Sequence, residues 1–379
     1  MKIVYCMNTI GLSGRDAIEV AKANYLAEIA EYDVWIVYTE VVKAGQYSIS
    51  DKVHLNDLGI RYLENTRRFP GNILTIISKT RLHKTRLTKL LRTIQPDIVI
   101  SCDSSERHVV PYIKGSWKTI REMHSIKNHK LLLSKTVFER FVSYLVGLFD
   151  YKWGLRKFDQ VVILTQEEKE KEWKGVKNVL VIPNFVRFTP GPSSSLTSKR
   201  IVAAGRLSWE KDFSSLIRAF RMVAARHPDW RLDIYGNGSE RDTLLKELQN
   251  LGLEQVVSIH DTVSDIEKEF CNSSLLVSTS KYEGFGMVLV EAMACGLPVV
   301  SYDCPYGPKS IISDGKDGYL VKAGDEQALA DCICTTIENP DLRIKMGHAA
   351  QISARERFSI DRIMSSWLSL FARLTENNA

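Results

Sequence analysis

Two hydrophobic patterns alternate along the chain. Short apolar runs rich in valine and isoleucine are followed by longer segments in which apolar residues recur every three or four positions. The short runs predict buried β-strands, and the longer segments predict amphipathic α-helices. Because such alternation is typical of parallel sheets with helices on both faces, we predict an α/β fold.

The N-terminal half carries the first set of these elements. Amphipathic patterns predict helices over Asp16–Glu31 and Lys84–Ile94. The apolar runs predict strands over Lys2–Met7, Asp33–Tyr38, Asp97–Ser101, Gln160–Thr165 and Val179–Ile182. This half is therefore expected to form one doubly wound sheet.

The same alternation restarts after Pro190–Ser198, a segment rich in proline and serine that has no periodicity and is typical of a linker. Beyond it, helices are predicted over Ser214–Arg226, Arg241–Leu251 and Gly286–Ala294. Strands are predicted over Arg200–Ala204, Arg231–Tyr235, Val256–His260, Ser274–Ser278, Pro298–Tyr302 and Gly318–Val321.

A chain of 379 residues is long for one hydrophobic core and suits two domains. We predict two facing Rossmann-like domains, over residues 1–188 and 189–359, with a final helix over about residues 360–379 packing back on the first. Doubly wound sheets bind ligands at the carboxyl ends of their strands, so the site is expected in a cleft between the domains.

Composition indicates the compartment. The chain is 44% hydrophobic and 25% charged, which is typical of globular proteins. Its seven cysteines are odd in number and scattered without a CxxC pair, which indicates a reducing environment. No apolar run approaches the roughly 20 residues that span a bilayer, and the sequence begins directly with a predicted strand. We expect a cytoplasmic protein that is neither secreted nor membrane-spanning.

Charge is distributed unevenly. Residues 1–190 contain 30 Lys and Arg against 20 Asp and Glu, whereas residues 191–379 contain 21 against 25. Between Arg61 and Lys157, 20 basic residues accompany 7 acidic ones. Such a surface attracts nucleic acid, an anionic membrane or a phosphorylated acceptor, unless it is simply solvated. We expect peripheral contact with an anionic membrane, such as the inner face of the plasma membrane, through residues 61–157, and no nucleic-acid partner.

The segment Lys281–Val300 is the most informative about chemistry. Glu283 closes a predicted strand-to-helix loop in which Gly284 and Gly286 let the backbone approach a ligand, and the following helix points its first N–H groups there. Glu291 lies in an otherwise apolar helix, where an unpaired carboxylate costs several kcal/mol. A ribose diol could provide its partner, unless Glu291 caps a hydrogen-bond network in the core and Glu283 is only a surface residue.

These residues resemble a known motif. Glu283-Gly-Phe-Gly, followed by Glu291-Ala-Met-Ala-Cys-Gly-Leu-Pro-Val-Val, is similar to the nucleotide-sugar motif of family 4 of the retaining GT-B glycosyltransferases. The segments Ala204–Lys211, Tyr235–Gly238 and Ile182–Asn184 add further landmarks. The resemblance implies a GT-B fold, with donor contacts from the following residues: Gly236, Gly238, Glu283, Phe285, Gly286, Met287 and Glu291.

Arg206 and Lys211 stand five residues apart in a loop that opens a helix. Two cations there could neutralise a diphosphate leaving group, although an Arg and a Lys on such a loop are also commonly just solvated. The sequence contains no Asp-x-Asp triplet to hold a metal-bridged diphosphate. We therefore expect no metal and no other cofactor, as the resemblance also implies.

Two further positions lie in the first half. Gly14 follows the first predicted strand and opens a helix, where its backbone could meet the donor or the acceptor; the related enzymes usually have two adjacent glycines, and this chain has Ser13-Gly14. His124 matches in place and context the histidine that similar enzymes direct at the transferred sugar. A lone histidine after a strand can equally be a satisfied structural residue.

The sequence thus predicts a retaining hexosyltransferase. It would move a sugar from a nucleoside diphosphate, expected to be UDP carrying a hexose or an N-acetylhexosamine, to a hydroxyl of a glycan or lipid-linked glycan acceptor. The catalytic candidates are His124, Arg206, Lys211 and Glu283. Two alternatives are a GT-B nucleotide-sugar epimerase and a non-catalytic protein that binds a nucleotide-sugar or a polyanion.

Overall fold

The computed structural model describes residues 1–11, 14–40, 48–62, 64, 73–102, 105–127, 137–187 and 193–376. The chain divides into two compact units. The N-terminal unit comprises Met1–Pro183 together with Ile363–Ala379, and the C-terminal unit comprises Asn184–Arg362. The boundary predicted between residues 188 and 189 falls among residues 188–192, outside the described residues.

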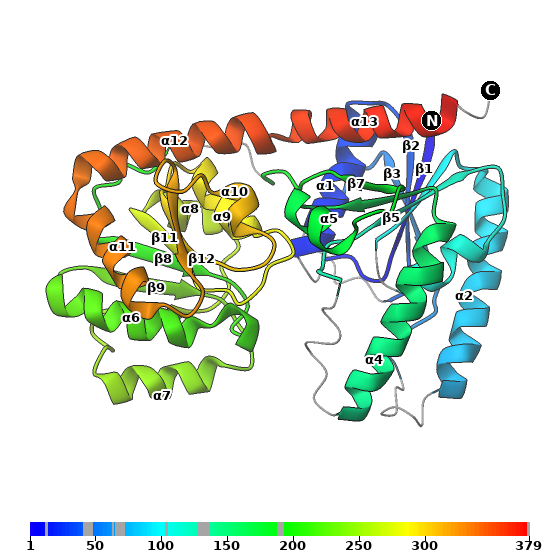
Figure 1. Cartoon of the computed structure of the whole chain (residues 1–379). Coiled ribbons are helices and arrows are strands. Elements are labelled where there is room, and N and C mark those ends of the chain that lie inside the picture. Colours follow the sequence, from blue (N-terminus) through cyan, green and yellow to red (C-terminus); the bar gives the residue numbers. More distant parts are fainter. Residues whose placement is uncertain are drawn as a thin grey trace. The chain divides into compact units, whose positions relative to one another are not determined.

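A parallel sheet forms the centre of the N-terminal unit. Seven strands in the described part of this unit follow the order β3-β2-β1-β4-β5-β6-β7 (Figure 1). They are β1 (Lys2–Met7), β2 (Asp33–Tyr38), β3 (Val53–Asp57), β4 (Ile98–Ser101), β5 (Lys118–Glu122), β6 (Gln160–Ile163) and β7 (Val179–Val181). Apolar side chains such as Val4, Val99 and Val161 form a core with the helices that pack on the sheet.

The helices of this unit include α13, which the chain reaches only after the other unit. The elements are α1 (Gly14–Glu28), η1 (Ser105–His108), η2 (Val110–Tyr112), α2 (Ile73–Ile94), α4 (Val137–Phe149), η3 (Asp150–Gly154), η4 (Leu155–Lys157), α5 (Gln166–Glu172) and α13 (Ile360–Glu376). From Ile363 onward α13 belongs to the N-terminal unit, and its Trp367 and Phe371 are buried.

The C-terminal unit also contains a parallel sheet, with the order β10-β9-β8-β11-β12-β13 within residues 193–376. Its strands are β8 (Arg200–Ala204), β9 (Arg231–Tyr235), β10 (Val257–His260), β11 (Leu275–Ser278), β12 (Val299–Asp303) and β13 (Gly318–Lys322). Its helices are η5 (Trp209–Lys211), α6 (Phe213–Arg226), α7 (Arg241–Leu251), α8 (Ile266–Cys271), α9 (Met287–Ala294), α10 (Pro308–Ile311), α11 (Glu326–Glu338) and α12 (Pro340–Phe358).

The predicted fold class is confirmed, and β1, β2, β8 and β9 have the predicted bounds. Two strands were missed. β3 lies at the edge of its sheet, and most of its residues are polar and at least partly exposed. β5 lies between β4 and β6 and is buried, yet its sequence, Lys-Thr-Ile-Arg-Glu, contains three charged residues. Because an apolar run is the usual signal of a central strand, the hydrophobic pattern did not reveal β5.

The buried charge of Arg121 in β5 is compensated by a carboxylate. Its Nη1 and Nη2 donate to Oδ1 and Oδ2 of Asp150, both at 2.9 Å, and both side chains are almost inaccessible. A bidentate pair of this kind satisfies both planar groups at once. The first residue of η3 is therefore joined to the middle of the sheet.

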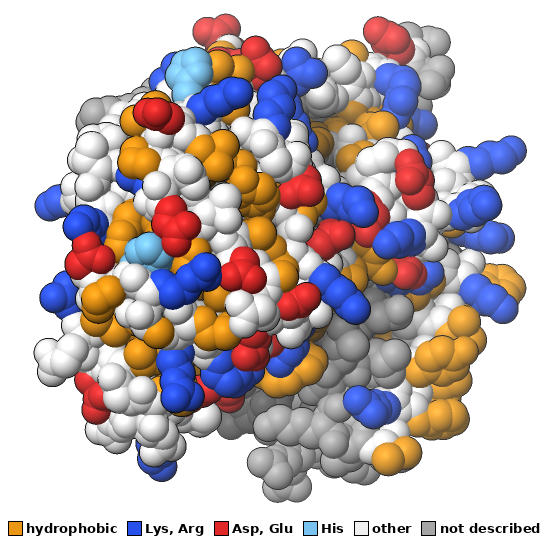
Figure 2. All heavy atoms as spheres, turned by 60° about the vertical axis from the view of Figure 1, so that its left-hand side comes forward, with side chains coloured by type: hydrophobic (Ala, Val, Ile, Leu, Met, Phe, Trp, Pro, Cys, Tyr) orange, Lys and Arg blue, Asp and Glu red, His pale blue; other side chains and the backbone are white. Residues whose placement is uncertain are grey.

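The surface and the cysteines agree with a globular protein. Basic and acidic side chains are mixed on the face turned forward in Figure 2 rather than gathered by sign. All seven cysteines are described, and none of them forms a disulfide. Among the described residues, no helix combines the length and the apolar character needed to cross a membrane.

The Arg121–Asp150 pair provides a stability test. Asp150→Asn leaves the guanidinium buried without its carboxylate, and the free energy of unfolding should fall by about 3–5 kcal/mol in urea denaturation followed by circular dichroism. Asp229→Asn, which removes the partner of Lys199 on an open surface, is the control and should leave stability nearly unchanged. Similar small effects in both variants would contradict this account.

Candidate functional site

The C-terminal sheet reverses its strand order at β8. This strand has β9 on one side and β11 on the other. In open α/β sheets such a switch point leaves a crevice outside the carboxyl ends of the two strands, because the connections leave in opposite directions. The loop after β8 carries Arg206 and Lys211, and the loop after β11 carries Glu283. Three of the predicted site residues therefore lie at one edge of one sheet.

Backbone contacts hold these two loops together. Thr279 Oγ1 donates to the carbonyl oxygens of Lys211 and Asp212, at 3.1 and 3.0 Å. The Lys281 N–H donates to the Glu210 carbonyl at 2.8 Å. Because these hydrogen bonds fix the backbones of both loops, they also fix the positions from which the side chains between the loops extend.

A third loop, after β9, packs equally closely. The Leu207 N–H donates to the Asn237 carbonyl at 3.0 Å. A Cβ atom at Gly236 would lie 1.8 Å from the Gly205 oxygen, and one at Gly238 would lie 2.1 Å from the Leu207 oxygen. Gly236 and Gly238, predicted to contact the donor, are thus required here by the contact between two backbones.

Lys211 and Glu283 contact each other directly. The Lys211 ammonium lies 2.5 Å from Glu283 Oε1, which also accepts a hydrogen bond from Ser280 Oγ at 2.7 Å. Both side chains are mostly shielded, at 22% and 14% exposure. Arg206 is exposed. The pKa of Tyr282 is raised by burial and by the carboxylates of Glu210 and Glu283. The charge of Arg206 opposes this shift.

The start of α9 adjoins this ion pair. Gly286 precedes the helix with φ of 105°, a conformation that favours glycine, and no side chain caps the first turn. The ring of Phe285 is buried edge-on against Phe358, with centroids 5.6 Å apart. Since that side chain is used in packing, Phe285 can meet a ligand only through its backbone.

Glu291, in the second turn of α9, has a protein partner that the sequence did not reveal. Its Oε1 accepts from Nε and Nη2 of Arg187, at 2.7 and 2.6 Å, and its side chain is 3% exposed. Burial raises the pKa of Glu291, and the Arg187 charge opposes this shift. Of the two predicted partners, a ribose and a hydrogen-bond network of the protein, the structure provides a protein partner, and a ribose would share the carboxylate with Arg187.

Gly14 and His124 belong to the other unit, which is described by itself. Gly14 is the first residue of α1, and a Cβ atom there would have no heavy atom of the described residues within 4 Å. Residues 12 and 13, which complete the predicted loop, lie outside the described residues. Unlike Gly236 and Gly238, Gly14 is not required by local packing.

His124, which follows β5, is held by buried charges. Its Nε2 lies 2.6 Å from Glu19 Oε1 and 3.1 Å from Glu122 Oε1. The Lys22 ammonium pairs with both carboxylates, at 3.0 Å from Glu19 Oε2 and in a short contact with Glu122 Oε2. We call Glu19, Lys22 and Glu122 the Lys22 cluster.

Among the residues that the structure describes, two groups of side chains have donor atoms close enough for a metal ion. One consists of Glu19, Glu122 and His124. There the Lys22 ammonium already pairs with both carboxylates, which makes this group an ion-pair cluster. The other consists of His227, Cys334 and Glu338, where the imidazole is paired with the Glu338 carboxylate at 2.8 Å.

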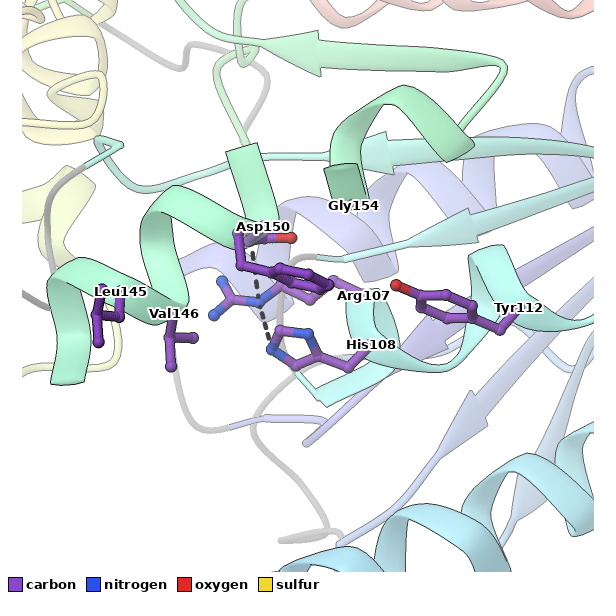
Figure 3. Close-up of a pocket in the computed structure, with 8 residues that line it drawn as sticks. Arg107, His108, Tyr112, Leu145, Val146, Asp150 and Gly154 are labelled. Atoms are coloured by element: carbon purple, nitrogen blue, oxygen red, sulfur yellow. Dashed lines mark hydrogen bonds and ion pairs between the residues drawn. The ribbon is translucent and has the colours of Figure 1, made fainter. Parts of the chain in front are cut away.

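A pocket of about 320 Å³ lies between α4 and the turns after β4. Figure 3 shows Leu145 and Val146 on one side of it and Tyr112 on the other, with Arg107 and His108 between. Arg107 contacts His108 and lies 3.8 Å from Asp150. The pocket thus combines an apolar wall with a basic edge.

Comparison with known sequences gives a match for the C-terminal unit. Residues 190–353 match the family described as Glycosyl transferases group 1. Over 223 residues the chain is 35% identical to an exopolysaccharide phosphotransferase of Streptomyces coelicolor, covering 57% of this chain and 23% of the relative. Over 248 residues it is 31% identical to a poly(ribitol-phosphate) alpha-N-acetylglucosaminyltransferase of Staphylococcus aureus, covering 65% and 49%. The chain thus spans less than half the length of these relatives.

The fold resembles that of S. aureus TarM, with a TM-score of 0.76 and 18% identity over 98% of this chain and 100% of that chain. Two parallel Rossmann-like sheets and this likeness define a GT-B protein. The C-terminal unit is a glycosyl transferases group 1 domain, so the family resemblance found in the sequence is confirmed.

The glycine contacts generate a prediction. Gly238→Ala forces a methyl group against the Leu207 carbonyl, and the resulting backbone shift should lower the free energy of unfolding by about 1–3 kcal/mol. Gly14→Ala is the matched control: the space there is open, and its stability should equal or slightly exceed that of the wild type. Thermal unfolding of both variants measures this. An unchanged melting temperature for Gly238→Ala would contradict the proposed contact.

Proposed function

We propose that the protein is a retaining glycosyltransferase that moves a sugar from a UDP-linked donor to a hydroxyl of a glycan or lipid-linked glycan. The observation that carries this proposal is the Lys211–Glu283 pair at the switch point of a group 1 domain, beside the start of α9. A cation and a carboxylate held next to free helix N–H groups suit a ligand that is anionic at one end and rich in hydroxyls at the other.

Each residue then has a role that follows from its chemistry. Arg206 and Lys211 bind the diphosphate and stabilise its charge as it departs. Glu283 accepts hydrogen bonds from the sugar hydroxyls, and the backbone N–H groups at the start of α9 donate to oxygens of the donor. Glu291, fixed by Arg187, accepts from the ribose. His124 supports the reacting face of the sugar.

The transfer needs no covalent intermediate on the protein. The bond from the anomeric carbon to the diphosphate breaks while the acceptor oxygen bonds to that carbon on the same face. The acceptor proton passes to a departing phosphate oxygen, which becomes basic as the bond breaks. The protein contributes position and positive charge. Because two cationic side chains take the part of a metal, the reaction is proposed to be metal-independent.

The relatives support a uridine nucleotide. TarM was crystallised with UDP and alpha-GlcNAc-glycerol. The S. aureus relative is named as an N-acetylglucosaminyltransferase acting on poly(ribitol-phosphate). We therefore propose UDP-N-acetylglucosamine as the first donor to test. Incubation with this donor alone separates transfer from epimerisation, because an epimerase would convert the sugar without an acceptor.

Arg206 and Lys211, which we call the phosphate clamp, provide the decisive test. Arg206→Ala or Lys211→Ala should lower turnover roughly a hundredfold or more, since one preorganised contact to the leaving group is worth on the order of 3–4 kcal/mol. The double variant should lose less than the product of the single effects, because both residues act on one group. Arg231→Ala, an exposed arginine at the opposite end of β9, is the control and should keep normal turnover.

Wild-type activity should also persist in EDTA. Activity that disappears with EDTA and returns with Mg²⁺ or Mn²⁺ would show that a metal holds the diphosphate. Near-normal turnover in the single variants would show that the clamp is elsewhere.

We further propose that the N-terminal unit docks on an anionic membrane. The exposed apolar side chains of α4 and the turn after it include Phe141, Phe149 and Trp153, at 58%, 62% and 63% exposure. Exposed basic residues follow at once, among them Lys152 and Arg156. An apolar helix face, an exposed tryptophan and neighbouring cations suit the interface of an anionic bilayer. A cytoplasmic protein peripheral to the inner face of the membrane fits this arrangement.

Vesicle cosedimentation tests the docking. The wild type should bind anionic vesicles at low salt and lose binding as salt rises, because the contact is partly electrostatic. Phe141→Ser with Trp153→Ser should weaken binding at least tenfold. Leu245→Ser, which removes an apolar side chain of 40% exposure on α7, is the matched control. Equal binding to neutral vesicles, or equal binding by the double variant, would contradict the proposal.

A further inference from the structure

The Lys22 cluster is the most deeply buried group of charges near a predicted catalytic residue. The side chains of Glu19, Lys22 and Glu122 are 0%, 1% and 2% exposed, and that of His124 is 8% exposed. Buried charges are tolerated only when they are paired, because leaving water costs several kcal/mol per ion. The charges of this group must therefore balance closely.

The cluster itself does not balance. Two carboxylates accompany one ammonium, which leaves one negative charge if His124 is neutral. Among the described residues, burial raises the pKa values of Tyr5 and Cys102, so both stay uncharged at neutral pH, and the charge of Arg15 acts on Glu19 without a direct contact between the two. The nearby guanidinium of Arg15 lies 3.4 Å from its own carboxylate partner, Asp16.

The orientation of the imidazole fixes one proton on Nε2, and the charge balance calls for a second proton on Nδ1. Its Nε2 faces two carboxylate oxygens, which only accept hydrogen bonds, so Nε2 must carry a proton. The other nitrogen, Nδ1, makes no hydrogen bond to any residue that the structure describes. Burial alone would lower the pKa of His124, but Glu122 and Glu19 raise it. The pKa of Glu19, which burial alone would raise, is lowered to about 2 by Lys22 and His124.

We propose that the Lys22 cluster positions His124 as an imidazolium, so that Nδ1–H is a fixed, positively charged donor toward the substrate. This inference rests on the role of His124 in the proposed function. The substrate atom that it suits is one that carries negative charge or gains it during transfer, such as an oxygen of the diphosphate or of the sugar. A neutral histidine in the same place could offer Nδ1 only as an acceptor.

Two aromatic rings also contact Lys22. Its ammonium lies 4.5 Å from the centre of the Trp367 ring and 5.6 Å from that of Tyr5. Both rings attract a cation through their faces. Trp367 lies in the part of α13 that belongs to the N-terminal unit, so this helix completes the enclosure of the cluster.

Titration of His124 by NMR tests the protonation state without any assay of activity. His124→Asn identifies its signals among the eight histidines. We expect the wild-type ring to remain an imidazolium at pH 7.5, well above the ordinary pKa of about 6.5. A wild-type ring that is neutral at pH 7.5 would overturn the proposal, whatever the protein catalyses.

Variants of the Lys22 cluster test whether the protonation state of His124 affects the reaction. Glu19→Gln or Glu122→Gln removes one charge that stabilises the imidazolium, so the titration of His124 should move to lower pH by one unit or more. Because the folded pKa is raised, the protonated state is present at low pH and is lost as pH rises. The pH profile of kcat should therefore be flat from pH 6 to 7.5 in the wild type and fall across this range in the variants.

Glu338→Gln is the matched control: it removes the partner of the more exposed His227 and should leave the pH profile of kcat unaltered. A folded variant with a neutral His124 and wild-type kcat at pH 7.5 would overturn the positioning role. Where a glutamine variant does not fold, the wild-type titration still decides the charge state. An imidazolium in a protein that transfers no sugar would instead reject the proposed function.

Discussion

Both sheets of this protein consist of parallel strands, and this constraint sets the location of all of the candidate chemistry. In a parallel sheet every carboxyl end lies at the same edge, so the loops that follow the strands gather there. Arg206 and Lys211 follow β8, and Glu283, 72 positions after Lys211, follows β11; these are the two strands at the switch point. His124 follows β5 in the other unit at the equivalent edge. With few exceptions, the side chains of the strands are apolar and buried. They therefore offer a ligand no polar contact.

Buried charges in the strands and in the helices beside them show how the fold accommodates charge. Arg121 is matched by Asp150, Glu291 by Arg187, and the two carboxylates beside His124 by Lys22. Except for Glu19 and Lys22, which both lie in α1, the partners come from different segments of the chain. Such pairing fixes two elements relative to each other as well as satisfying the charge, because neither partner can leave without exposing the other to an apolar environment. The buried ion pairs therefore fix the positions of these elements within each unit.

The sequence predicted the strands wherever the apolar run was uninterrupted, and it predicted which loops carry the motif residues. It did not predict β5, because Arg121 and Glu122 interrupt the run. It also did not predict Arg187, since nothing in the neighbourhood of that residue shows that it will meet Glu291 more than a hundred positions later. Partners of this kind depend on three-dimensional packing and leave no periodic signal. The close backbone contacts of Gly236 and Gly238 were likewise invisible, although their residue type was noted.

The return of α13 to the N-terminal unit affects how the molecule can be made. The unit begins at Met1, but the buried side chains of Ile363, Trp367 and Phe371 belong to it as well. During synthesis the whole of Asn184–Arg362 must leave the ribosome before these residues can pack. The C-terminal unit is contiguous and can fold as soon as it emerges, whereas the unit translated first waits with an open apolar groove. Until translation reaches the end of α13, the apolar surface that these three side chains cover stays exposed to water.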